Sequence, residues 1–530
     1  MSMKKSLIAC AFFIAYSIST LAQSNWLDTT FAGKGIFSQD SMFTTTMIIQ
    51  EDGKILMGGD YYRNYDNLAL TRLNPDGSLD SSFGKNGYVL PINQNFTDIH
   101  SFWAWICGLV QQKDGKIVAA GIAGNEDAFQ DYYPTKTCLA RYKINGSIDS
   151  SFGTNGFIAD VFDSVWGAVS CNVMIDSSGR VFLTNLDDGQ ISFVGNNYSN
   201  YRPYSAYRTY CYDTSGHLDT TFGIGGGIYI TSDLVPFIFS SCIQPDQKIL
   251  YCGADSTKSV FSLIRYNASG TLDSSFGING VAGISCDPNE LGAFNSICVQ
   301  SDGKILVSKY LFANDSGYFK VSRFTNTGNI DNTFGQSGCV EILTPIPRIH
   351  NVNNDVSFVA QYPNGNILVG ASAVSDTIFR SKGFFAFARY LPDGIIDSTF
   401  GINGVLDDTI VYGYGGSYLP VIMGLSILSD NKFIASSGNQ ANRYLEVAMN
   451  TSIKTIDASS FSIYPDPAGD HLYISGLPPS ATLCIIDMTG RICYTPSSLR
   501  EIDVSALPSG VYLLRIQDSS AYVVKKFVKE

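Results

Sequence analysis

Short runs of alternating apolar and polar residues, joined by tight polar turns, recur along most of this chain. Two such runs flank the segment QEDGKIL at 50–56. An Asp-Gly pair between alternating apolar residues is a strong signal for a β-hairpin. Related turns lie at 112–118, 176–182, 244–250, 300–306, 362–368 and 428–434. The pattern therefore predicts seven hairpins.

A second motif, the hexapeptide LDSSFG at 79–84, separates one hairpin from the next. Its variants lie at 27–32, 148–153, 218–223, 272–277, 330–335 and 396–401. The Asp and hydroxyl residues favour a capped single turn, and the Gly suits a left-handed exit from it. We interpret the motif as structural punctuation, with Leu79 and Phe83 packed on a core. Its recurrence about every 60 residues indicates one supersecondary unit repeated and stacked.

A third apolar strand follows each hairpin, as at 68–74, and a fourth strand follows each hexapeptide. Four short antiparallel strands repeated seven times predict an all-β protein, a seven-bladed β-propeller over residues 23–449. The first hexapeptide lacks a preceding hairpin, and the last hairpin lacks a following hexapeptide. The N-terminal strand should therefore complete the last blade, which closes the ring and removes free sheet edges.

These units resemble the delta-60 repeat family of bacterial exported proteins over about 27–449. The resemblance implies the propeller fold. It implies no particular ligand, because the family is defined by its repeat and not by an activity.

The N-terminal 22 residues have the pattern of a secretory signal peptide. Lys4 and Lys5 precede an apolar run at 7–18, and we predict cleavage between Ala22 and Gln23. The apolar run is too short to span a bilayer, so we expect no transmembrane segment.

The C-terminal part of the chain has a different pattern. A polar linker at 450–460 precedes four alternating segments within 461–530. Segments of this length and spacing predict a small immunoglobulin-like β-sandwich with its own modest core.

The same four segments resemble the type A C-terminal sorting domain of the bacterial type IX secretion system. The residues that carry this sorting signal are Tyr464, Pro465, Pro467, Gly490, Gly510, Tyr512, Lys525, Lys526 and Lys529. Asp466 stands where the family usually has Asn, and Asp supports the same side-chain turn. The resemblance implies the type IX machinery as a partner, removal of this domain, and a secreted or outer-membrane surface location in a Gram-negative bacterium.

Composition argues against several classes of function. The net charge is −12 with only 15% charged residues, which disfavours binding to nucleic acid. The four histidines show no metal spacing and no evident nucleophile beside them, so we expect no metal or triad catalysis. Glycoside hydrolysis stays open, because its two carboxylates can be distant in sequence. We expect a monomer.

Twelve cysteines are spread thinly along the chain. Cys484 and Cys493 flank the turn at 487–490 symmetrically, so we predict a cross-strand disulfide between them. We interpret the remaining cysteines of the exported chain as small buried apolar residues.

Two polar patterns recur in the repeats and are candidate sites. Asn74, Asp76 and Asp80 resemble the oxygen-rich loops of calcium-binding propellers, and Asp213 and Asp219 repeat part of this set. The other copies lack these oxygens, whereas calcium needs six to eight ligands, so we favour a structural turn and keep calcium as the one candidate cofactor.

An Arg precedes the second Gly turn of most units by five residues. It occurs as Arg72, Arg141, Arg265, Arg323 and Arg389, with Cys211 in its place in one unit. Repetition beside a repeated Asp predicts a structural ion pair within each blade.

The connections between second and third strands are rich in tyrosine and should all emerge on one face. Their tyrosines are Tyr61, Tyr62, Tyr65, Tyr132, Tyr133, Tyr198, Tyr201, Tyr204, Tyr207, Tyr310 and Tyr318. Tyr with Asn and Ser is typical of a recognition surface, so we expect a rim that binds glycan or protein, without enzymatic activity. The alternative for the tyrosines is that these loops only cap the blades. The alternatives are a carbohydrate-active hydrolase, lyase or lactonase in the propeller channel, and a passive surface-structural protein.

Overall fold

The structure is a computed structural model. It describes residues 26–39, 42–61, 67–90, 101–125, 134–158, 165–166, 171–187, 206–231, 237–255, 260–285, 291–313, 316–347, 357–377, 380–401, 403–411, 422–446, 462–475, 482–487, 492–494, 496, 500–518 and 521–530. The chain divides into a larger unit, Gln23–Glu446, and a smaller unit that includes Val447–Glu530. The predicted signal peptide and linker lie outside the described residues.

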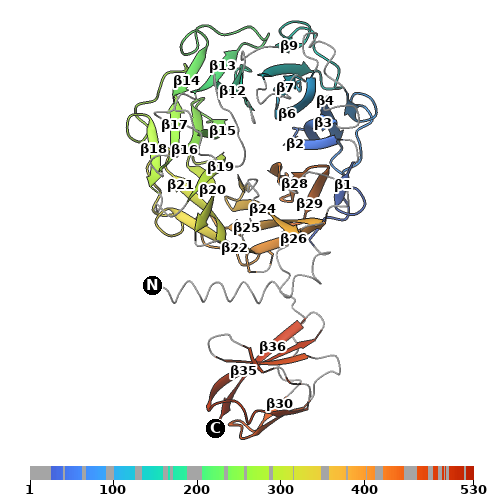
Figure 1. The fold of residues 1–530 in the computed structure, drawn as a ribbon, viewed down its shortest axis with the longest axis vertical. Helices are drawn as coiled ribbons and strands as arrows, with labels where there is room; N and C mark the ends of the chain where they lie inside the picture. The colour runs from blue at the N-terminus through green and yellow to red at the C-terminus, as the bar shows by residue number, and fades with distance from the viewer. Residues whose placement is uncertain are drawn as a thin grey trace. The chain divides into compact units, whose positions relative to one another are not determined.

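Within the described part of the larger unit, all regular structure is β, arranged as seven sheets around a ring (Figure 1). The first sheet contains β2 (Met42–Ile49), β3 (Ile55–Tyr61), β4 (Asn67–Leu73) and β5 (Tyr88–Val89). The second contains β6 (Ser101–Gln111), β7 (Ile117–Asn125) and β8 (Pro134–Tyr142), with β9 (Phe157–Ile158) and β10 (Val165–Trp166) both paired to β8. The third contains β11 (Cys171–Ile175), β12 (Val181–Asp187), β13 (Ala206–Tyr212) and β14 (Gly227–Thr231).

The fourth sheet contains β15 (Phe237–Ile243), β16 (Ile249–Asp255), β17 (Val260–Tyr266) and β18 (Val281–Ser285). The fifth contains β19 (Leu291–Val299), β20 (Ile305–Ala313), β21 (Ser316–Phe324) and β22 (Cys339–Pro347). The sixth contains β23 (Ser357–Gln361), β24 (Ile367–Thr377), β25 (Arg380–Tyr390) and β26 (Val405–Val411).

The seventh sheet joins the two ends of the larger unit. It has the order β1 (Ile36–Ser38), β29 (Gln440–Tyr444), β28 (Phe433–Ser437) and β27 (Gly424–Ile427). Ile36 pairs with Asn442, and Ser38 pairs with Gln440. The predicted closure by the N-terminal strand is therefore confirmed.

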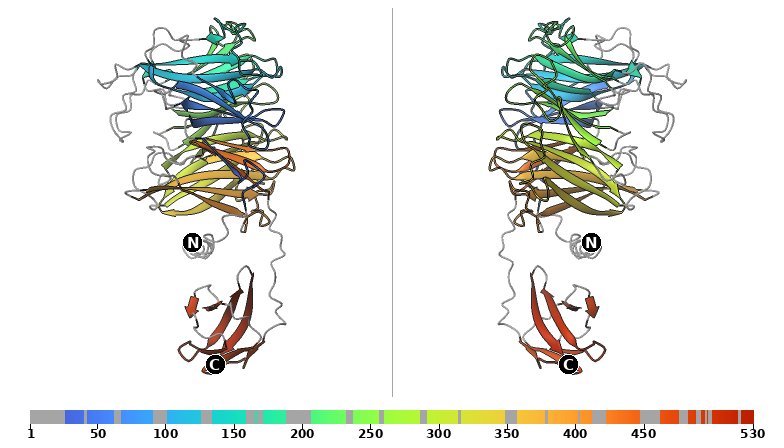
Figure 2. Two further views of the ribbon diagram at one scale, coloured as in Figure 1. Left: turned by 90° about the vertical axis from the view of Figure 1, so that its right-hand side faces the viewer. Right: turned by 90° about the vertical axis from the view of Figure 1, so that its left-hand side faces the viewer.

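The first strands of the sheets line the inside of the ring, which Figure 2 shows from the side. Each contacts the next, in the order β2, β6, β11, β15, β19, β23, β27 and back to β2. Because all strand pairs are antiparallel, the connections between second and third strands leave each sheet at the end opposite to the hairpin turns.

The cores of the ring lie between neighbouring sheets. One cluster combines Leu56 of the first sheet with Ile117 of the second. The motif phenylalanines Phe31, Phe83, Phe152, Phe222, Phe276, Phe334 and Phe400 are all buried. Leu79 does not share this burial: it is 37% exposed and packs on the tight turn at Gly87. The expectation that Leu79 enters the core is wrong, because a glycine turn offers no side chain to cover it.

The smaller unit is a β-sandwich, as the sequence pattern predicts. One sheet has the order β30 (Ser462–Tyr464), β31 (His471–Ser475) and β34 (Glu501–Asp503). The other has the order β33 (Ile492–Tyr494), β32 (Thr482–Asp487), β35 (Gly510–Asp518) and β36 (Ala521–Lys529). Leu472 and Ile502 of the first sheet share a buried core with Ile485, Leu514 and Phe527 of the second.

Candidate functional site

In every sheet of the larger unit except the third, an arginine of the third strand pairs with the Asp of the hexapeptide. In the first sheet, Arg72 Nε lies 2.8 Å from Asp80 Oδ2, and Lys54 Nζ lies 3.6 Å from the same oxygen. The same pairing at 2.8–2.9 Å joins Arg141 to Asp149, Arg265 to Asp273, Arg323 to Asp331 and Arg389 to Asp397, and Arg443 to Asp28 at the ring closure. The predicted ion pair is confirmed for Arg72, Arg141, Arg265, Arg323 and Arg389.

The same arginines also fasten one sheet to the next. Arg72 Nη1 donates to the backbone oxygen of Ile144 in the second sheet, and its guanidinium lies 4.3 Å from the ring centroid of Phe83. Equivalent bonds run from Arg141 to Thr214 O, from Arg265 to Asn326 O, from Arg323 to Pro392 O and from Arg443 to Pro75 O. A buried guanidinium that satisfies a carboxylate, a carbonyl and a ring face serves structure.

The third sheet departs from this scheme. Cys211 occupies the arginine position, and Arg180 from the preceding hairpin lies 2.7 Å from Asp176 and 3.3 Å from Asp219. Arg180 Nη2 also donates to Ala268 O of the fourth sheet at 3.3 Å. Burial raises the pKa of Cys211 to about 12, so its thiol stays neutral.

The paired carboxylates are strongly acidic. Burial alone would raise the pKa of Asp149, but hydrogen bonds from Ser151 and the charge of Arg141 outweigh it and lower the pKa to about 2. The pKa values of Asp28 and Asp331 also fall to about 2, again because hydrogen bonds and cations outweigh burial. These side chains are fully ionised at neutral pH and are poor proton donors or acceptors.

The calcium candidates make the contacts of tight turns. Asp76 accepts hydrogen bonds from Ser78 N at 2.9 Å and Ser78 Oγ at 2.6 Å, and Asn74 Nδ2 donates to Ser78 Oγ. Asp213 accepts from the backbone of Ser215 and His217, and Asp219 accepts from Thr221. Across the described segments, no group of three or more His, Cys, Asp or Glu side chains could hold a metal. The contacts fit the structural-turn interpretation, and calcium binding stays a prediction.

Most of the predicted tyrosine rim lies outside the described residues. This applies to Tyr62, Tyr65, Tyr132, Tyr133, Tyr198, Tyr201 and Tyr204. Tyr61 ends β3 and is half-buried. Tyr310 and Tyr318 lie inside β20 and β21, because these strands extend further than the sequence pattern indicated.

Tyr207 corrects the rim prediction at one position. It belongs to β13, is 9% exposed and packs in the core cluster that joins the third and fourth sheets. Burial raises its pKa to about 12. The strand begins at Ala206, so Tyr207 is a core residue and not part of a loop.

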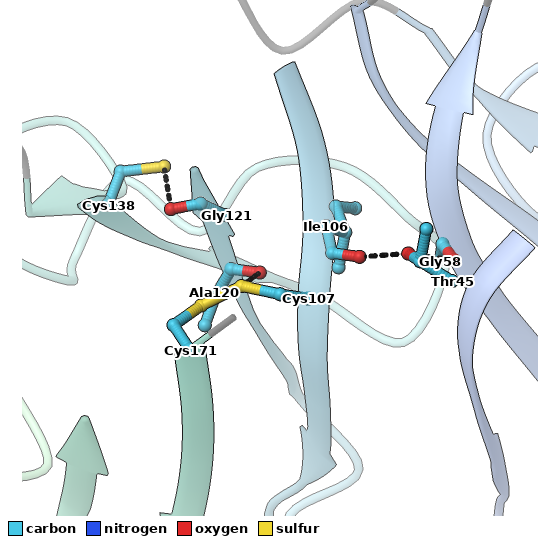
Figure 3. Close-up of a disulfide and its surroundings, with 8 residues drawn as sticks. All are labelled: Thr45, Gly58, Ile106, Cys107, Ala120, Gly121, Cys138 and Cys171. Carbon is cyan, nitrogen blue, oxygen red and sulfur yellow. Dashed lines mark hydrogen bonds between the residues drawn. A yellow bond between two sulfur atoms is a disulfide. The ribbon is translucent and has the colours of Figure 1, made fainter. Parts of the chain in front are cut away.

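A disulfide joins the inner strands of the second and third sheets. Cys107 of β6 is bonded to Cys171 of β11, with their Cα atoms 5.6 Å apart (Figure 3). The expectation that both are small buried apolar residues is wrong. Each stands five residues before the first residue of its hairpin turn, Gln112 or Asp176, and this shared position is the signal that could have indicated the pairing.

The predicted disulfide between Cys484 and Cys493 is not formed. β32 and β33 pair Ile485 with Tyr494 and Ile486 with Ile492, with a register shift between these pairs. The extra residue moves Cys493 out of the position opposite Cys484, so the symmetric hairpin that the prediction assumed does not occur.

Two hydrogen bonds extend the link between inner strands. Thr45 Oγ1 of β2 donates to Ile106 O of β6, beside the disulfide (Figure 3). Asn172 Nδ2 of β11 donates to Ser241 Oγ of β15 at 2.9 Å. Side-chain contacts thus tie the inner strands of the first four sheets in succession.

In the smaller unit, the turn at 464–467 is fastened to the last strand. Asp466 Oδ1 accepts a hydrogen bond from Val528 N at 2.8 Å, and Ala468 N donates to Val528 O at 2.7 Å. Tyr512 OH donates to Pro508 O, and its ring stacks on Phe527. Asp466 therefore joins the two ends of the domain, in addition to the local turn that the sequence predicts.

The other sorting-signal residues occupy distinct places. Tyr464 is exposed and stacks on Tyr473. Lys525 and Lys526 lie on β36, and Lys529 of the same strand is buried. Gly490 lies outside the described residues.

Two family models match this chain. The model described as a domain of unknown function (DUF5122) beta-propeller matches residues 50–83, 112–152, 244–276 and 300–334. The model described as a secretion system C-terminal sorting domain matches residues 462–530. A search of curated proteins found no match.

Solved structures show weak overall similarity. A protein of unknown function from Dyadobacter fermentans is 11% identical, with 71% of this chain and 100% of that chain covered, at a TM-score of 0.37. The extracellular domains 1–2 of Drosophila Semaphorin 1a are 11% identical, with 90% and 98% covered, at 0.37. An endo-arabinase from Bacteroides thetaiotaomicron is 10% identical, with 71% and 96% covered, at 0.29.

No helix in the described segments is long and apolar enough to cross a membrane. The repeated antiparallel sheets, their closure by the N-terminal strand and the two family matches agree with one another. This chain is a β-propeller protein with a C-terminal sorting domain of the type IX secretion system.

Proposed function

We propose that this protein is exported through the type IX secretion machinery and that its propeller then binds a glycan or a protein at the cell surface or in the medium. The sorting domain at 462–530 supports the export step. The binding step is supported by how the two ends of the ring differ.

The main support for the proposal is that the charged groups at the hairpin end already form ion pairs with one another. Arg72, Asp80 and Lys54 and their equivalents neutralise one another and fasten neighbouring sheets. A carboxylate with a pKa near 2 is a poor general acid at neutral pH, so this end is unsuited to hydrolysis.

The opposite end carries the longest and most aromatic connections. The segment at 188–205 links the second and third strands of the third sheet and contains Tyr198, Tyr201 and Tyr204 among Asn and Ser residues. Tyrosine with short amide and hydroxyl side chains supplies broad contact area and adaptable hydrogen bonds. This composition supports recognition of a glycan or protein there.

The test is a glycan and matrix-protein array probed with the chain that lacks residues 1–22, with calcium and with a chelator. We expect specific binding, reduced at least tenfold when Tyr198, Tyr201 and Tyr204 are replaced by Ala. Tyr473→Ala removes an exposed tyrosine from the sorting domain and serves as the matched control. Unchanged binding by the triple variant would exclude these tyrosines as the binding surface. Turnover of a polysaccharide or lactone without stable binding would favour the enzyme alternative.

Export is tested separately in the native bacterium. We expect the full chain to reach the surface or medium and a chain ending at residue 460 to stay in the periplasm. Equal export of both would contradict the role of the sorting domain.

A further inference from the structure

The outer face of the three-stranded sheet in the smaller unit carries two tyrosines side by side. Residues of β30, β31 and β34 alternate in exposure, and Leu472, Ile474 and Ile502 lie in the core of the domain. Tyr464 of β30 lies directly opposite Tyr473 of β31, and their rings stack with centroids 5.8 Å apart. Tyr464 is 52% exposed and Tyr473 is 36% exposed, so the pair presents an aromatic surface to solvent.

Acidic side chains continue this surface onto the third strand. Glu501 of β34 lies opposite Tyr473, and Tyr473 OH donates a hydrogen bond to Glu501 Oε1 at 3.1 Å. Asp503 lies opposite His471, whose Nδ1 is 3.5 Å from the same Glu501 oxygen. All positions of these three strands are described, and none of them is Lys or Arg. The outer face therefore combines two aromatic rings with a negative edge.

We call the outward residues of these strands the tyrosine face. They are Ser462, Tyr464, His471, Tyr473, Ser475, Glu501 and Asp503.

The other sheet of the domain distributes its exposed apolar side chains differently. Among its described residues, Tyr494 of β33 and Val511 of β35 are exposed, and β32 lies between these two strands. A single exposed apolar side chain is ordinary on a protein surface, whereas clustered aromatic side chains are typical of protein interfaces. The tyrosine face is therefore the stronger candidate for a docking surface.

The role of the domain and its charge indicate what docks there. Residues 462–530 match the sorting domain of a secretion system, so a protein of that system has to contact the outside of this domain. A guanidinium or ammonium group can pair with a carboxylate and lie on an aromatic ring at the same time. A basic protein surface thus fits the tyrosine face, whereas the carboxylates repel the anionic headgroups of a membrane.

We propose that the tyrosine face, centred on Tyr464, Tyr473 and Glu501, docks onto a basic surface of the secretion machinery. This inference rests on the proposed export function, and it specifies the recognised side of the sorting domain and the charge of the partner. The family resemblance places Tyr464 in the sorting signal. Strand pairing adds Tyr473 and Glu501, which come from two other strands.

Export of the full chain in the native bacterium tests the two rings. Tyr464→Ala combined with Tyr473→Ala should lower the fraction of the protein outside the cell at least tenfold. Tyr464→Phe combined with Tyr473→Phe should stay within twofold of the parent, because both rings remain. Tyr494→Ala is the matched control, since it removes a similarly exposed tyrosine from the other sheet. Normal export of the double Ala variant would overturn the proposal.

The charge of the partner is tested by reversing the negative edge. Glu501→Lys combined with Asp503→Lys should reduce export more than Glu501→Gln combined with Asp503→Asn, because reversal adds repulsion from a basic partner. Export of the reversed variant at or above the level of the neutral variant would overturn the assignment of a basic partner.

A photo-crosslinking residue identifies the occupant without relying on a loss of export. With p-benzoylphenylalanine at position 473 of the full chain, illumination during export should link the chain to a protein whose deletion blocks export of the parent. The same residue at position 494 should not give this product. Crosslinks at position 473 to the chain's own propeller, to a second copy or to lipopolysaccharide would overturn the proposed occupant.

Two further measurements separate docking from folding and from the export role itself. The double Ala variant without residues 1–22 should keep the melting temperature and circular dichroism spectrum of the parent; if it unfolds, the crosslink decides. Normal export of the double Ala variant, together with retention of a chain ending at residue 460, would overturn the tyrosine face alone. Export of that truncated chain at the parent level would overturn the proposed export function as well.

Discussion

In the third sheet, Arg180 of the hairpin turn supplies the guanidinium group that the third strand lacks, because Cys211 stands at the usual arginine position. Its nitrogens reach Asp219, the hexapeptide Asp of that sheet, and Ala268 O of the next sheet. Those are the partners that Arg72 has in Asp80 and Ile144 O. The contact between the third and fourth sheets is therefore preserved, although the third sheet has Cys211 in place of the usual arginine.

If Arg180 replaces the missing arginine, an arginine introduced at position 211 should compensate for the loss of Arg180. Arg180→Ala should lower the free energy of unfolding by about 2–3 kcal/mol, less than for a fully buried ion pair because Arg180 is partly exposed. The double variant Arg180→Lys with Cys211→Arg restores the arrangement of the other sheets and should recover most of this loss. The measurement is urea unfolding followed by circular dichroism. A double variant as unstable as Arg180→Ala would show that the two positions are not interchangeable.

Acid should destabilise the ring through its paired carboxylates. The pKa values of Asp28, Asp149 and Asp331 are lowered from 3.8 to about 2 in the folded chain. A folded-state pKa below the unfolded one contributes stability above pH 4, and this contribution disappears as the pH falls from about 4 to 2. Melting temperatures measured from pH 6 to pH 2 should therefore drop mainly below pH 4.

Asp149→Asn is the control for the acid effect. It should be less stable than the parent at pH 7 and should lose less stability between pH 4 and pH 2, because one linked proton is missing. An identical pH profile for parent and variant would exclude Asp149 as a contributor.

The disulfide should contribute substantially to stability. It links two residues with a sequence separation of 64. A disulfide that closes a loop of that size lowers the entropy of the unfolded chain and so stabilises the folded state by about 4 kcal/mol. We expect dithiothreitol to lower the melting temperature of the parent, and Cys107→Ser with Cys171→Ser to show the lower value with or without reductant. Cys484→Ser with Cys493→Ser should keep the full response to reductant. Loss of the response in this second variant would instead indicate that Cys484 and Cys493 form a disulfide, contrary to the strand register.

Asp466 should be replaceable by Asn but not by Ala in the sorting domain. Both Asp and Asn offer an Oδ1 that can accept the hydrogen bond of Val528 N, whereas Ala leaves the last strand without this contact. We expect normal export of Asp466→Asn and at least a fivefold loss for Asp466→Ala, measured as the fraction of the protein outside the cell. Equal export of all three forms would show that this contact does not matter for sorting.

Features that arise from local turn chemistry and short-range pairing could be predicted from the sequence. Asp-Gly turns between alternating residues placed the hairpins, and the recurrence of LDSSFG indicated the repeated sheets and their closure. The pairing of Arg72 with Asp80 was predictable as well, because only eight residues separate them on adjacent segments. Family resemblance identified the sorting domain.

The contacts between sheets could not be predicted in this way, because they depend on how the folded ring arranges the sheets. Cys107 meets Cys171, and Arg180 reaches Ala268, because the ring places neighbouring sheets face to face. The shared position of the two cysteines in their repeats becomes a pairing only when these sheets are neighbours. Strand length and register were likewise settled by packing: Tyr207 entered the core with β13, and one extra residue separated Cys484 from Cys493. A slip of one residue changes which side chains face each other, so such pairings depend on the whole sheet and not on the local sequence.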